Sequence, residues 1–390
     1  MKNKRTPEIR FLEFNANWEE RMLDDLLLDV SRPLKMVDDE TYQLVTVKRR
    51  NGGIVPRGFF KGSEVLVKSQ FIIKSGDYLI SKRQVVHGAN GIVPDYLDGS
   101  IVSNEYLVLH GTKDLSIGFF SLISGLPSMY KNFFLSSYGI DIEKLVFNVS
   151  DWKKRKIFIP SISEQQKITS FFEIINNAIT LHQQELTTLK QTKQGFLQKM
   201  FPREKESIPE VRFTRFTGNW EQHKLCDVAD MFDNLRIPVT ASERIKGATP
   251  YYGANGVQDY VEGFTHDGEF VLVAEDGAND LINYPVNYVN GKVWINNHAH
   301  VISGQKEILD NLFLVTRIRS MNISTYLVGG GRAKLNGETL KKIPITIPSF
   351  EEQVEIGKFF KKIDDVIALH QRELDALKET KKAFLQKMFV

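Results

Sequence analysis

Residues 160–201 read PSISEQQKITSFFEIINNAITLHQQELTTLKQTKQGFLQKMF, and residues 348–389 repeat this stretch as PSFEEQVEIGKFFKKIDDVIALHQRELDALKETKKAFLQKMF. The two copies align without a gap at an offset of 188 residues, and 24 of the 42 aligned positions are identical. Two unrelated amphipathic segments would not share this many positions, so the chain contains an internal repeat.

In both copies, apolar side chains recur at alternating intervals of four and three residues, with a histidine at the same place in each series. A seam that repeats every 3.5 residues over more than four heptads is typical of a coiled coil rather than of a helix on a globular core. The predicted seam residues are Ile168, Phe172, Ile175, Ile179, His182, Leu186 and Leu189, then Ile356, Phe360, Ile363, Ile367, His370, Leu374 and Leu377.

Each copy begins with the S-x-x-E pattern of a capping box, in which hydroxyl and carboxylate satisfy unpaired amides of the first turn. The residues are Ser161, Glu164, Ser349 and Glu352. Pro202 is expected to end the first helix. A helix of this length spans roughly 57 Å and must pack against something. We expect the two copies to pair as an antiparallel coiled coil, with one folded body near each end.

A second repeat precedes the folded bodies. Residues 7–26, PEIRFLEFNANWEERMLDDL, match PEVRFTRFTGNWEQHKLCDV at residues 209–228, at an offset of 202. We call these stretches the leading segments, and we expect Trp18 and Trp220 to anchor each of them on its body. The predicted domains are 1–158 (leading segment and first body), 160–201 (first spacer helix), 202–208 (linker), 209–347 (leading segment and second body) and 348–390 (second spacer helix).

The two bodies, residues 27–158 and 229–346, show mixed α and β patterns. Short alternating or β-branched runs predict strands at residues 42–48, 77–82, 100–110, 270–276 and 286–297. The pair Asn290-Gly291 predicts a hairpin turn within the last of these runs. The expected fold class is α+β: two mixed α/β domains separated by two long helices that form an antiparallel coiled coil with a pseudo-two-fold relation.

The length and composition of the chain limit the classes of protein to which it can belong. A chain of 390 residues with 42% apolar and 25% charged residues is long enough for two or three domains. Cys226 is the only cysteine, which excludes an internal disulfide and a zinc site built on several thiolates. The first ten residues lack an apolar run, and no stretch approaches the roughly 18 apolar residues of a membrane span. We therefore expect a cytoplasmic protein with no membrane partner.

Polar side chains in the seam have a structural interpretation. His182, His370, Lys193 and Lys381 fall within it, and a polar residue there commonly fixes the register of a coiled coil. A metal-binding or catalytic role for the two histidines would need further ligands, and we identify none at helical spacing. The sequence therefore predicts no metal site.

Catalytic signatures are missing from the sequence. It contains no N-P-P-[YF] or D-P-P-Y tetrapeptide to hold a flipped adenine, and no G-x-x-x-x-G-K-[ST] loop for ATP phosphates. The glycine-rich stretch at residues 329–332 lacks the strand and helix of a dinucleotide site, so we expect a loop there. These observations favour a binding role.

The alternation of unlike bodies with near-identical helices resembles the specificity subunit of type I restriction-modification enzymes. Both repeated helices carry, in this order, the motifs P-S-x-x-E-Q, F-F, I-x-L-H-Q-x-E-L and F-L-Q-K-M-F. The resemblance covers essentially the whole chain. The segments PYYGANGV (250–257), GKVWINNHAHV (291–301) and LKKIPITIPSFEEQ (340–353) also resemble recurring elements of that family.

This resemblance implies a subunit without a catalytic centre. Each body, as a target recognition domain, would read one half of a bipartite site in double-stranded DNA, and the coiled coil would set the gap between the halves. Two modification subunits would dock on it and methylate adenines with S-adenosylmethionine, and two restriction subunits would complete an ATP- and Mg-dependent endonuclease. No cofactor is expected in this chain itself.

DNA recognition requires Lys and Arg for phosphates, and Arg, Asn, Gln, Ser or His for base edges. The first body carries 18 Lys and Arg against 13 Asp and Glu, whereas the second carries 11 against 13, so the second body would have to use local groups. The candidate contacts are Lys48, Arg49, Arg50, Asn51, Lys82, Arg83, Gln84, His87, Asn90, Asn255, Asn296, Asn297, His298, Arg332 and Lys334.

The polar stretch in the second body has two interpretations. A period of two would place Trp294, Asn296, His298 and His300 on one strand face. This face could contact DNA, or it could form the hydrogen-bonded core of a hairpin. The pair of histidines in H-x-H lacks a third metal ligand nearby.

Two alternatives to a DNA-specificity subunit follow from the same sequence. The nearly neutral charge, +3 overall, also suits an interaction scaffold whose bodies bind proteins rather than DNA. A stand-alone nuclease or methyltransferase has no supporting motif.

Overall fold

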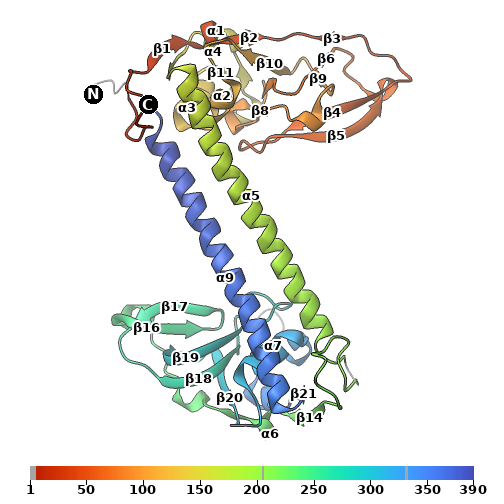
Figure 1. Cartoon of the computed structure of the whole chain (residues 1–390), viewed down its shortest axis with the longest axis vertical. Coiled ribbons are helices and arrows are strands. Elements are labelled where there is room, and N and C mark those ends of the chain that lie inside the picture. The colour runs from red at the N-terminus through yellow and green to blue at the C-terminus, as the bar shows by residue number, and fades with distance from the viewer. Residues whose placement is uncertain (1–5, 204–205, 330–332) are drawn as a thin grey trace. The chain divides into compact units, whose positions relative to one another are not determined.

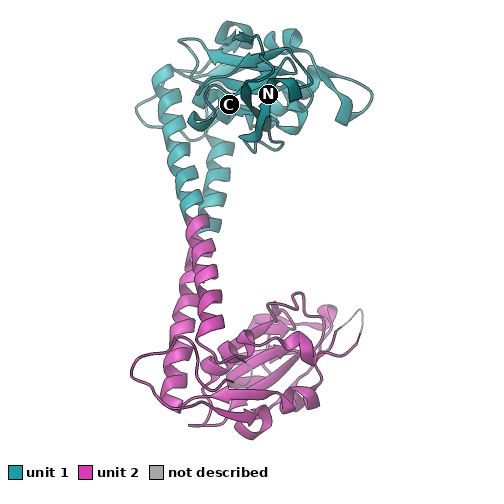
Figure 2. Ribbon diagram, turned by 90° about the vertical axis from the view of Figure 1, so that its right-hand side faces the viewer, with its two compact units in different colours: residues 1–181, 374–390 teal, residues 182–373 magenta. Residues whose placement is uncertain are grey.

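The structure is a computed structural model that describes residues 6–203, 206–329 and 333–390. The chain divides into two compact units (Figure 2). Unit 1 consists of Met1–Leu181 and Leu374–Val390, and unit 2 consists of His182–Glu373. The boundary passes through the long helices, so each unit contains part of both. The assignment of these helices as separate spacer domains stays a prediction.

The internal repeat forms two long helices of 38 residues each, α5 (Ile162–Lys199) and α9 (Phe350–Lys387) (Figure 1). In unit 1, the ring centroids of Phe171 and Phe384 are 4.9 Å apart. In unit 2, those of Phe196 and Phe359 are 5.1 Å apart. Within unit 2, His182 meets His370, Lys193 meets Asp364 and Phe196 meets Phe359. Rising numbers on α5 thus meet falling numbers on α9, so the helices pair antiparallel, which confirms the prediction.

The body of unit 1 is built on two sheets, with strand orders β2-β10-β7-β8 and β3-β6-β9-β4-β5. Their strands are β2 (Leu27–Asp29), β3 (Pro33–Leu34), β4 (Thr41–Val47), β5 (Ile54–Lys61), β6 (Gln70–Ile72), β7 (Tyr78–Ser81), β8 (Asn90–Ile92), β9 (Ile101–Ser103) and β10 (Tyr106–Gly111). The remaining elements are β1 (Glu19–Met22), β11 (Ser137–Tyr138), β12 (Val146–Phe147), β13 (Lys156–Ile159), α1 (Leu23–Leu26), α2 (Ile117–Ser124), α3 (Pro127–Leu135) and α4 (Val149–Lys153).

The body of unit 2 is built on one six-stranded sheet of order β15-β20-β18-β19-β16-β17. Its strands are β15 (Ala229–Met231), β16 (Lys246–Gly253), β17 (Gly256–Val261), β18 (His266–Ala274), β19 (Val286–Ile295) and β20 (Ala299–Gly304). The other elements are β14 (Glu221–Lys224), β21 (Pro344–Ile347), α6 (Leu225–Val228), α7 (Asn311–Ser320) and α8 (Gly337–Lys342). Alternate residues of β18, Val271 and Val273, share an apolar core with Phe313 of α7. The helix thus covers one face of the sheet.

Both units close their bodies with the same two-stranded clasp. In unit 1, β1 pairs antiparallel with β13, with Glu19 opposite Ile159. In unit 2, β14 pairs with β21, with Glu221 opposite Ile347. These partners are related by the offsets of the two sequence repeats, 202 and 188. The repeats therefore encode the frame that joins body to helix, whereas the sheets inside the bodies differ.

The tryptophans of the leading segments are buried in this frame. The Trp18 ring lies 5.9 Å from that of Phe119 and 6.2 Å from that of Phe389, and all three belong to unit 1. The Trp220 ring lies 5.9 Å from that of Phe201 in unit 2. The prediction that each tryptophan anchors its leading segment is confirmed.

The predicted hairpin turn at Asn290-Gly291 is wrong. Both residues lie inside β19, where Asn290 pairs with Glu269 and Gly291 with Gly268 of the antiparallel strand β18. The chain reverses between these strands at residues 275–285 instead. Gly268 and Gly291 have φ values of 145° and 93°, which glycine adopts readily, and they face each other within the paired strands rather than in a turn.

Candidate nucleic-acid interface

The first turn of each long helix is fastened to the body beside it by a buried ion pair. Arg10 donates from Nε and Nη2 to the Glu164 carboxylate, both at 2.7 Å, and that carboxylate is 1% exposed. Arg212 and Glu352 repeat these contacts in unit 2 at the same distances. The predicted capping box of the first helix is therefore only half formed. The Glu164 amide reaches Ser161 Oγ at 3.4 Å, but its carboxylate takes the stronger charge-assisted bonds to arginine.

The glutamine after each glutamate adds a second fastening. Gln165 is buried; its Oε1 accepts from the Ser116 amide at 2.9 Å, and its Nε2 donates to the Asp114 carbonyl at 2.9 Å. In unit 2, Gln353 accepts from the Asp310 amide at 3.0 Å. The E-Q pair of the repeat thus orients the body relative to the start of its helix, and so positions the candidate DNA-contacting loops of that unit.

In unit 1, the tip of the β4–β5 hairpin, residues 48–51, docks on the turn before β8. The Arg50 amide donates to the His87 carbonyl at 2.7 Å, and the Asn51 amide donates to the Gly88 carbonyl at 2.9 Å. Arg50 and Asn51 have φ values of 59° and 52°, which is uncommon for residues other than glycine. Backbone strain of this kind clusters at functional sites, because the surrounding structure has to maintain it.

The side chains at this tip form an exposed basic group. Lys48, Arg49 and Arg50 are exposed, and Arg49 Nη2 contacts Glu143 Oε2 at 2.7 Å. His87 Nε2 lies 3.5 Å from the same carboxylate. An exposed ion pair contributes little to stability, so Arg49 can exchange Glu143 for a phosphate at small cost. The structure thus brings the first four candidates together with His87.

Lys82 and Arg83 turn to a different loop. Lys82 Nζ donates to the Asn104 carbonyl at 2.7 Å, and Arg83 Nε donates to Glu105 Oε2 at 2.7 Å. The hydrogen bond to Glu105 raises the pKa of Arg83. Both contacts are exposed, so these side chains stay available for phosphate, but as a site separate from the hairpin tip.

Asn90 lies inside the fold, and Gln84 is half-buried. Asn90 is buried in β8, and its Oδ1 accepts from Tyr78 Oη at 2.6 Å. Gln84 Oε1 is buried without a hydrogen-bond partner among the described residues. This placement argues against direct DNA contact by Asn90, because its side chain completes the polar core rather than the surface. A pattern of polar residues along the sequence does not distinguish the two environments.

In unit 2, two of the candidates meet at the loop that follows β18. Asn255 Nδ2 donates to the Gly277 carbonyl at 2.9 Å, and its Oδ1 accepts from the Asn279 amide at 3.0 Å. His298 Nδ1 lies 2.6 Å from Asp276 Oδ1. Side chains from the β16–β17 turn and the β19–β20 turn therefore hold this loop, which we call the polar loop of unit 2.

The predicted single strand face around His298 is wrong. Trp294 belongs to β19 and His300 to β20, and the residues between them form a turn. Asn296 is buried, and its Oδ1 accepts from the His298 amide at 2.8 Å, which closes that turn. Asn297 is exposed at its tip. Asn296 therefore belongs to the hydrogen-bonded core of the hairpin, the second of the two interpretations. Asn297 and His298 remain accessible to DNA.

His300 is a core residue with both ring nitrogens satisfied. Its Nδ1 lies 2.6 Å from Asp233 Oδ2, and its Nε2 donates to the Leu335 carbonyl at 2.8 Å. Burial alone would raise the pKa of Asp233, but hydrogen bonds from His300 and from the Val301 amide outweigh burial and hold that pKa below its usual value. The carboxylate therefore stays charged inside the unit.

Lys334 joins the same network through Glu275. Arg236 Nη1 and Lys334 Nζ contact the Glu275 carboxylate at 2.7 and 2.8 Å. Burial would raise the pKa of Glu275, but these two cations outweigh it and lower the pKa, and the pKa of Lys334 rises in turn. Lys334 thus stabilises the base of the polar loop, which weakens its case as a phosphate contact. Arg332 lies outside the described residues.

Sequence reasoning missed three members of this network. Asp233 and Arg236 lie three residues apart in the turn between β15 and β16, whereas Glu275 follows β18 and meets them only through the fold of the sheet. The spacing of Asp233 and Arg236 is visible in the sequence, but only a prediction of tertiary contacts could have linked them to Glu275.

The predicted seam residues fall into two groups by exposure. The buried ones are Ile168, Phe172, Ile175, Leu186, Ile356, Phe360 and Leu374. The half-buried ones are Ile179, His182, Leu189, Ile363, Ile367, His370 and Leu377. Lys193 Nζ contacts Asp364 Oδ1 at 2.5 Å, so this seam lysine is paired across the helices of unit 2.

Comparison with known proteins identifies the family. The profile of the type I restriction modification DNA specificity domain matches residues 15–191 and 217–379. A Haemophilus influenzae protein named as a type I restriction enzyme specificity subunit is 51% identical over 138 residues, 35% of this chain and 36% of that protein. One of Methanocaldococcus jannaschii, named as the MjaX specificity subunit, is 23% identical over 275 residues, 65% of this chain and 63% of its own length. The matches thus span less than two thirds of these relatives.

Solved structures share the fold. The crystal structure of a type I restriction-modification S subunit from M. genitalium superposes with a TM-score of 0.69 at 15% identity, covering 99% of both chains. A chain from a structure of the type I restriction-modification system superposes with a TM-score of 0.51 at 16% identity, covering 97% of this chain and 98% of that one. No helix in the described part of the chain is long and apolar enough to cross a membrane. Because the domain profile matches both halves of the sequence, this chain belongs to the type I restriction-modification DNA specificity family.

Proposed function

We propose that this chain is the DNA-specificity subunit of a type I restriction-modification enzyme, in which each body recognises one half of a bipartite DNA site. The observation that carries this proposal is the repeated fastening of unlike bodies to near-identical helices. The pairs Arg10–Glu164 and Arg212–Glu352 have the same geometry, although the sheets that they support differ. Two different recognition surfaces on one repeated frame suit an asymmetric target.

The hairpin tip at residues 48–51 is the proposed contact surface of the first body. Three exposed basic side chains gather there, on a backbone held in a strained conformation, and they would neutralise phosphates and reach base edges. The polar loop of unit 2 is the proposed surface of the second body, with Asn255, Asn297 and His298. That body has no excess of positive charge, so neutral hydrogen-bonding groups would supply more of its contacts.

The long helices are proposed to set the gap and to dock two copies of one modification subunit. Leu181 and Leu369 occupy equivalent positions of the repeat and are 55% and 47% exposed. Equivalent exposed apolar side chains suit one partner that binds twice. In this proposal the chain acts in the cytoplasm without a catalytic centre. S-adenosylmethionine, and ATP with Mg²⁺ where restriction subunits join, would bind to the partner subunits.

The test is to express the chain with its cognate modification subunit and to map methylated adenines by sequencing. A bipartite motif with a constant gap is expected. Exchange of residues 229–346 for another second body should change one half-site only, with the other half-site as the internal control. Deletion of one matched heptad from both helices should change the gap, and an unchanged gap would contradict the spacer role.

Binding of the purified complex to duplex DNA separates this proposal from a protein-interaction scaffold. Phosphate neutralisation releases counterions, so the affinity of a DNA-binding complex should fall steeply as salt is raised. A complex that does not bind DNA at low salt would favour the scaffold.

A further inference from the structure

Two His-Glu pairs face each other across the helices of unit 2. The repeat carries H-Q-Q-E at residues 182–185 and H-Q-R-E at residues 370–373. Residues three apart lie on the same face of a helix, so each glutamate is one turn from its histidine. The expectation that the histidines have no further ligands at helical spacing is wrong, because Glu185 and Glu373 lie at that spacing.

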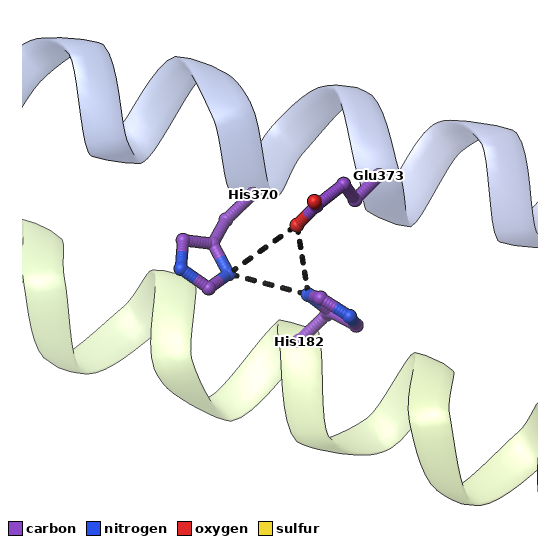
Figure 3. A group of neighbouring side chains, drawn as sticks. All are labelled: His182, His370 and Glu373. Atoms are coloured by element: carbon purple, nitrogen blue, oxygen red, sulfur yellow. Dashed lines mark hydrogen bonds and ion pairs between the residues drawn. The ribbon is translucent and has the colours of Figure 1, made fainter.

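The antiparallel pairing brings His182, His370 and Glu373 together (Figure 3). Glu185 lies beside this group, next to His370. The two Nδ1 atoms, of His182 and His370, are 3.2 Å apart. Across the seam, His370 Nδ1 lies 3.3 Å from Glu185 Oε2, and His182 Nδ1 lies 3.7 Å from Glu373 Oε2. Within each helix, the corresponding distances are 3.8 and 4.0 Å. Two imidazoles and two carboxylates thus converge from both helices.

These distances match the coordination shell of a small cation. Zinc binds imidazole nitrogen and carboxylate oxygen at about 2.0–2.2 Å in tetrahedral geometry, which places neighbouring ligand atoms roughly 3.3–3.5 Å apart. The two nitrogens, 3.2 Å apart, are already close to this spacing. The two nitrogens and a carboxylate oxygen of Glu373 lie within 4.8 Å of one another. Glu185, 3.3 Å from His370, is 43% exposed and has room to turn inward as the fourth ligand.

We propose that His182, Glu185, His370 and Glu373 bind one divalent transition-metal ion of the zinc class. Imidazole with carboxylate is a ligand set for Zn²⁺, Co²⁺ or Ni²⁺ rather than for Mg²⁺ or Ca²⁺, which prefer oxygen ligands only. The ion would join α5 to α9 by two ligands from each helix and so fix their register. The half-buried histidines and exposed glutamates leave the site open to solvent, from which the ion enters.

A second cluster in unit 2 shows why this one is distinctive. Asp233, Glu275 and His300 also converge within metal-binding distance of one another. Their negative charge is already neutralised by Arg236 and Lys334, whose cationic groups lie 2.7 and 2.8 Å from Glu275. At the helix seam, no Lys or Arg contacts Glu185 or Glu373 in the ion pairs of the described residues. That pair of carboxylates can therefore receive a metal cation.

The test is a titration of the full-length chain, freed of metal with EDTA, with Zn²⁺ and separately with Co²⁺. Calorimetry should show one Zn²⁺ per chain with a dissociation constant below about 1 μM, the weak end for a four-ligand site. Bound Co²⁺ should give the intense visible absorption of tetrahedral coordination. The absence of both signals would overturn the proposal, because the two histidines would then share only a hydrogen bond.

Variants locate the ion. His182→Gln and His370→Gln should each weaken Zn²⁺ binding by more than the 10- to 100-fold that loss of an outer-shell partner causes. Glu185→Gln with Glu373→Gln should do the same. Glu173→Gln, at an exposed position of α5 outside the cluster, is the matched control and should leave affinity unchanged. Binding that survives in both histidine variants would overturn the assignment, and the Co²⁺ spectrum of the wild-type chain decides if a variant does not fold.

Discussion

The buried ion pairs that fasten the helices should differ in strength between the two units. We consider Arg10→Met in unit 1 and Arg212→Met in unit 2. Each change removes a bidentate partner from a glutamate that is 1% exposed and keeps the apolar stem of the side chain. Breaking a buried pair on one side destabilises a protein by about 3–5 kcal/mol, because the remaining charge stays buried and uncompensated.

The two substitutions should destabilise their units by different amounts, because the two glutamates have different neighbours. In unit 1, Trp18 Nε1 donates to Glu164 Oε1 at 3.4 Å, so Glu164 keeps one donor after the loss of Arg10. In unit 2, Trp220 Nε1 has no hydrogen-bond partner among the described residues, so Glu352 keeps no indole donor. A hydrogen bond to a charged group contributes about 1.5–3 kcal/mol, and the long distance places this one at or below the lower end. Arg212→Met should therefore cost about 1 kcal/mol more than Arg10→Met.

Native-state hydrogen exchange with mass spectrometry measures the opening free energies of both units in one chain. Amides of β7 report the opening of unit 1, and those of β18 report the opening of unit 2. Each variant should lower the opening free energy of its own unit, and the other unit is the internal control. In the double variant Arg212→Met/Glu352→Met most of the loss should be recovered, since replacing a whole buried pair by apolar groups is often neutral. Equal losses in the two units, or a loss below about 1 kcal/mol, would refute the reasoning.

Three further predictions concern single side chains. Under the proposed function, Arg50→Ala should weaken duplex binding and reduce the salt slope by about 1, whereas Lys61→Ala, at the other end of the same hairpin, should change neither; binding isotherms at several salt concentrations measure both. Burial lowers the pKa of His266, so its contribution to stability is complete above the unfolded pKa near 6.5 and declines as pH falls toward the folded pKa. In the His266→Gln variant, the free energy of unfolding measured with urea should fall less between about pH 7.5 and 5.5 than in the wild-type chain. The same fall in both proteins would contradict this role of His266. Gln353→Ala should cost about 1–3 kcal/mol in the same assay, because it leaves the Asp310 amide without its acceptor.

The helices could be predicted from the sequence because their pattern is local and repeated. The repeat at residues 160–201 contains α5, which begins and ends two residues inside it, and the second copy contains α9 in the same way. Heptad spacing fixes which face of each helix is covered, and an antiparallel partner of the same sequence is available in the chain. The clasp strands were not predicted, since their pairing joins residues more than a hundred positions apart.

The candidate site could be predicted only in part. Lys48, Arg49 and Arg50 are adjacent in sequence, so a hairpin tip brings them together without help from the rest of the fold. Asn90 and Asn296 looked equally polar but are buried, because sheet register decides which side of a strand or turn faces the core. The capping-box glutamates were identified correctly as helix-start residues, yet their partners lie 154 and 140 residues away and no local rule names them.

The near-identity of the two helices raises the question of how each leading segment selects its own. The repeats carry one pair whose charges are exchanged between units: Glu13 contacts Lys167 in unit 1, and at the equivalent positions Arg215 contacts Glu355 in unit 2. If the leading segments exchanged helices, glutamate would face glutamate and arginine would face lysine. Like charges across an interface disfavour the wrong partner even where the correct pair adds little stability. The buried Arg–Glu pairs cannot make this distinction, because they are the same in both units. The exchanged pair therefore lets a duplicated frame keep its two halves distinct while the fastening itself stays identical.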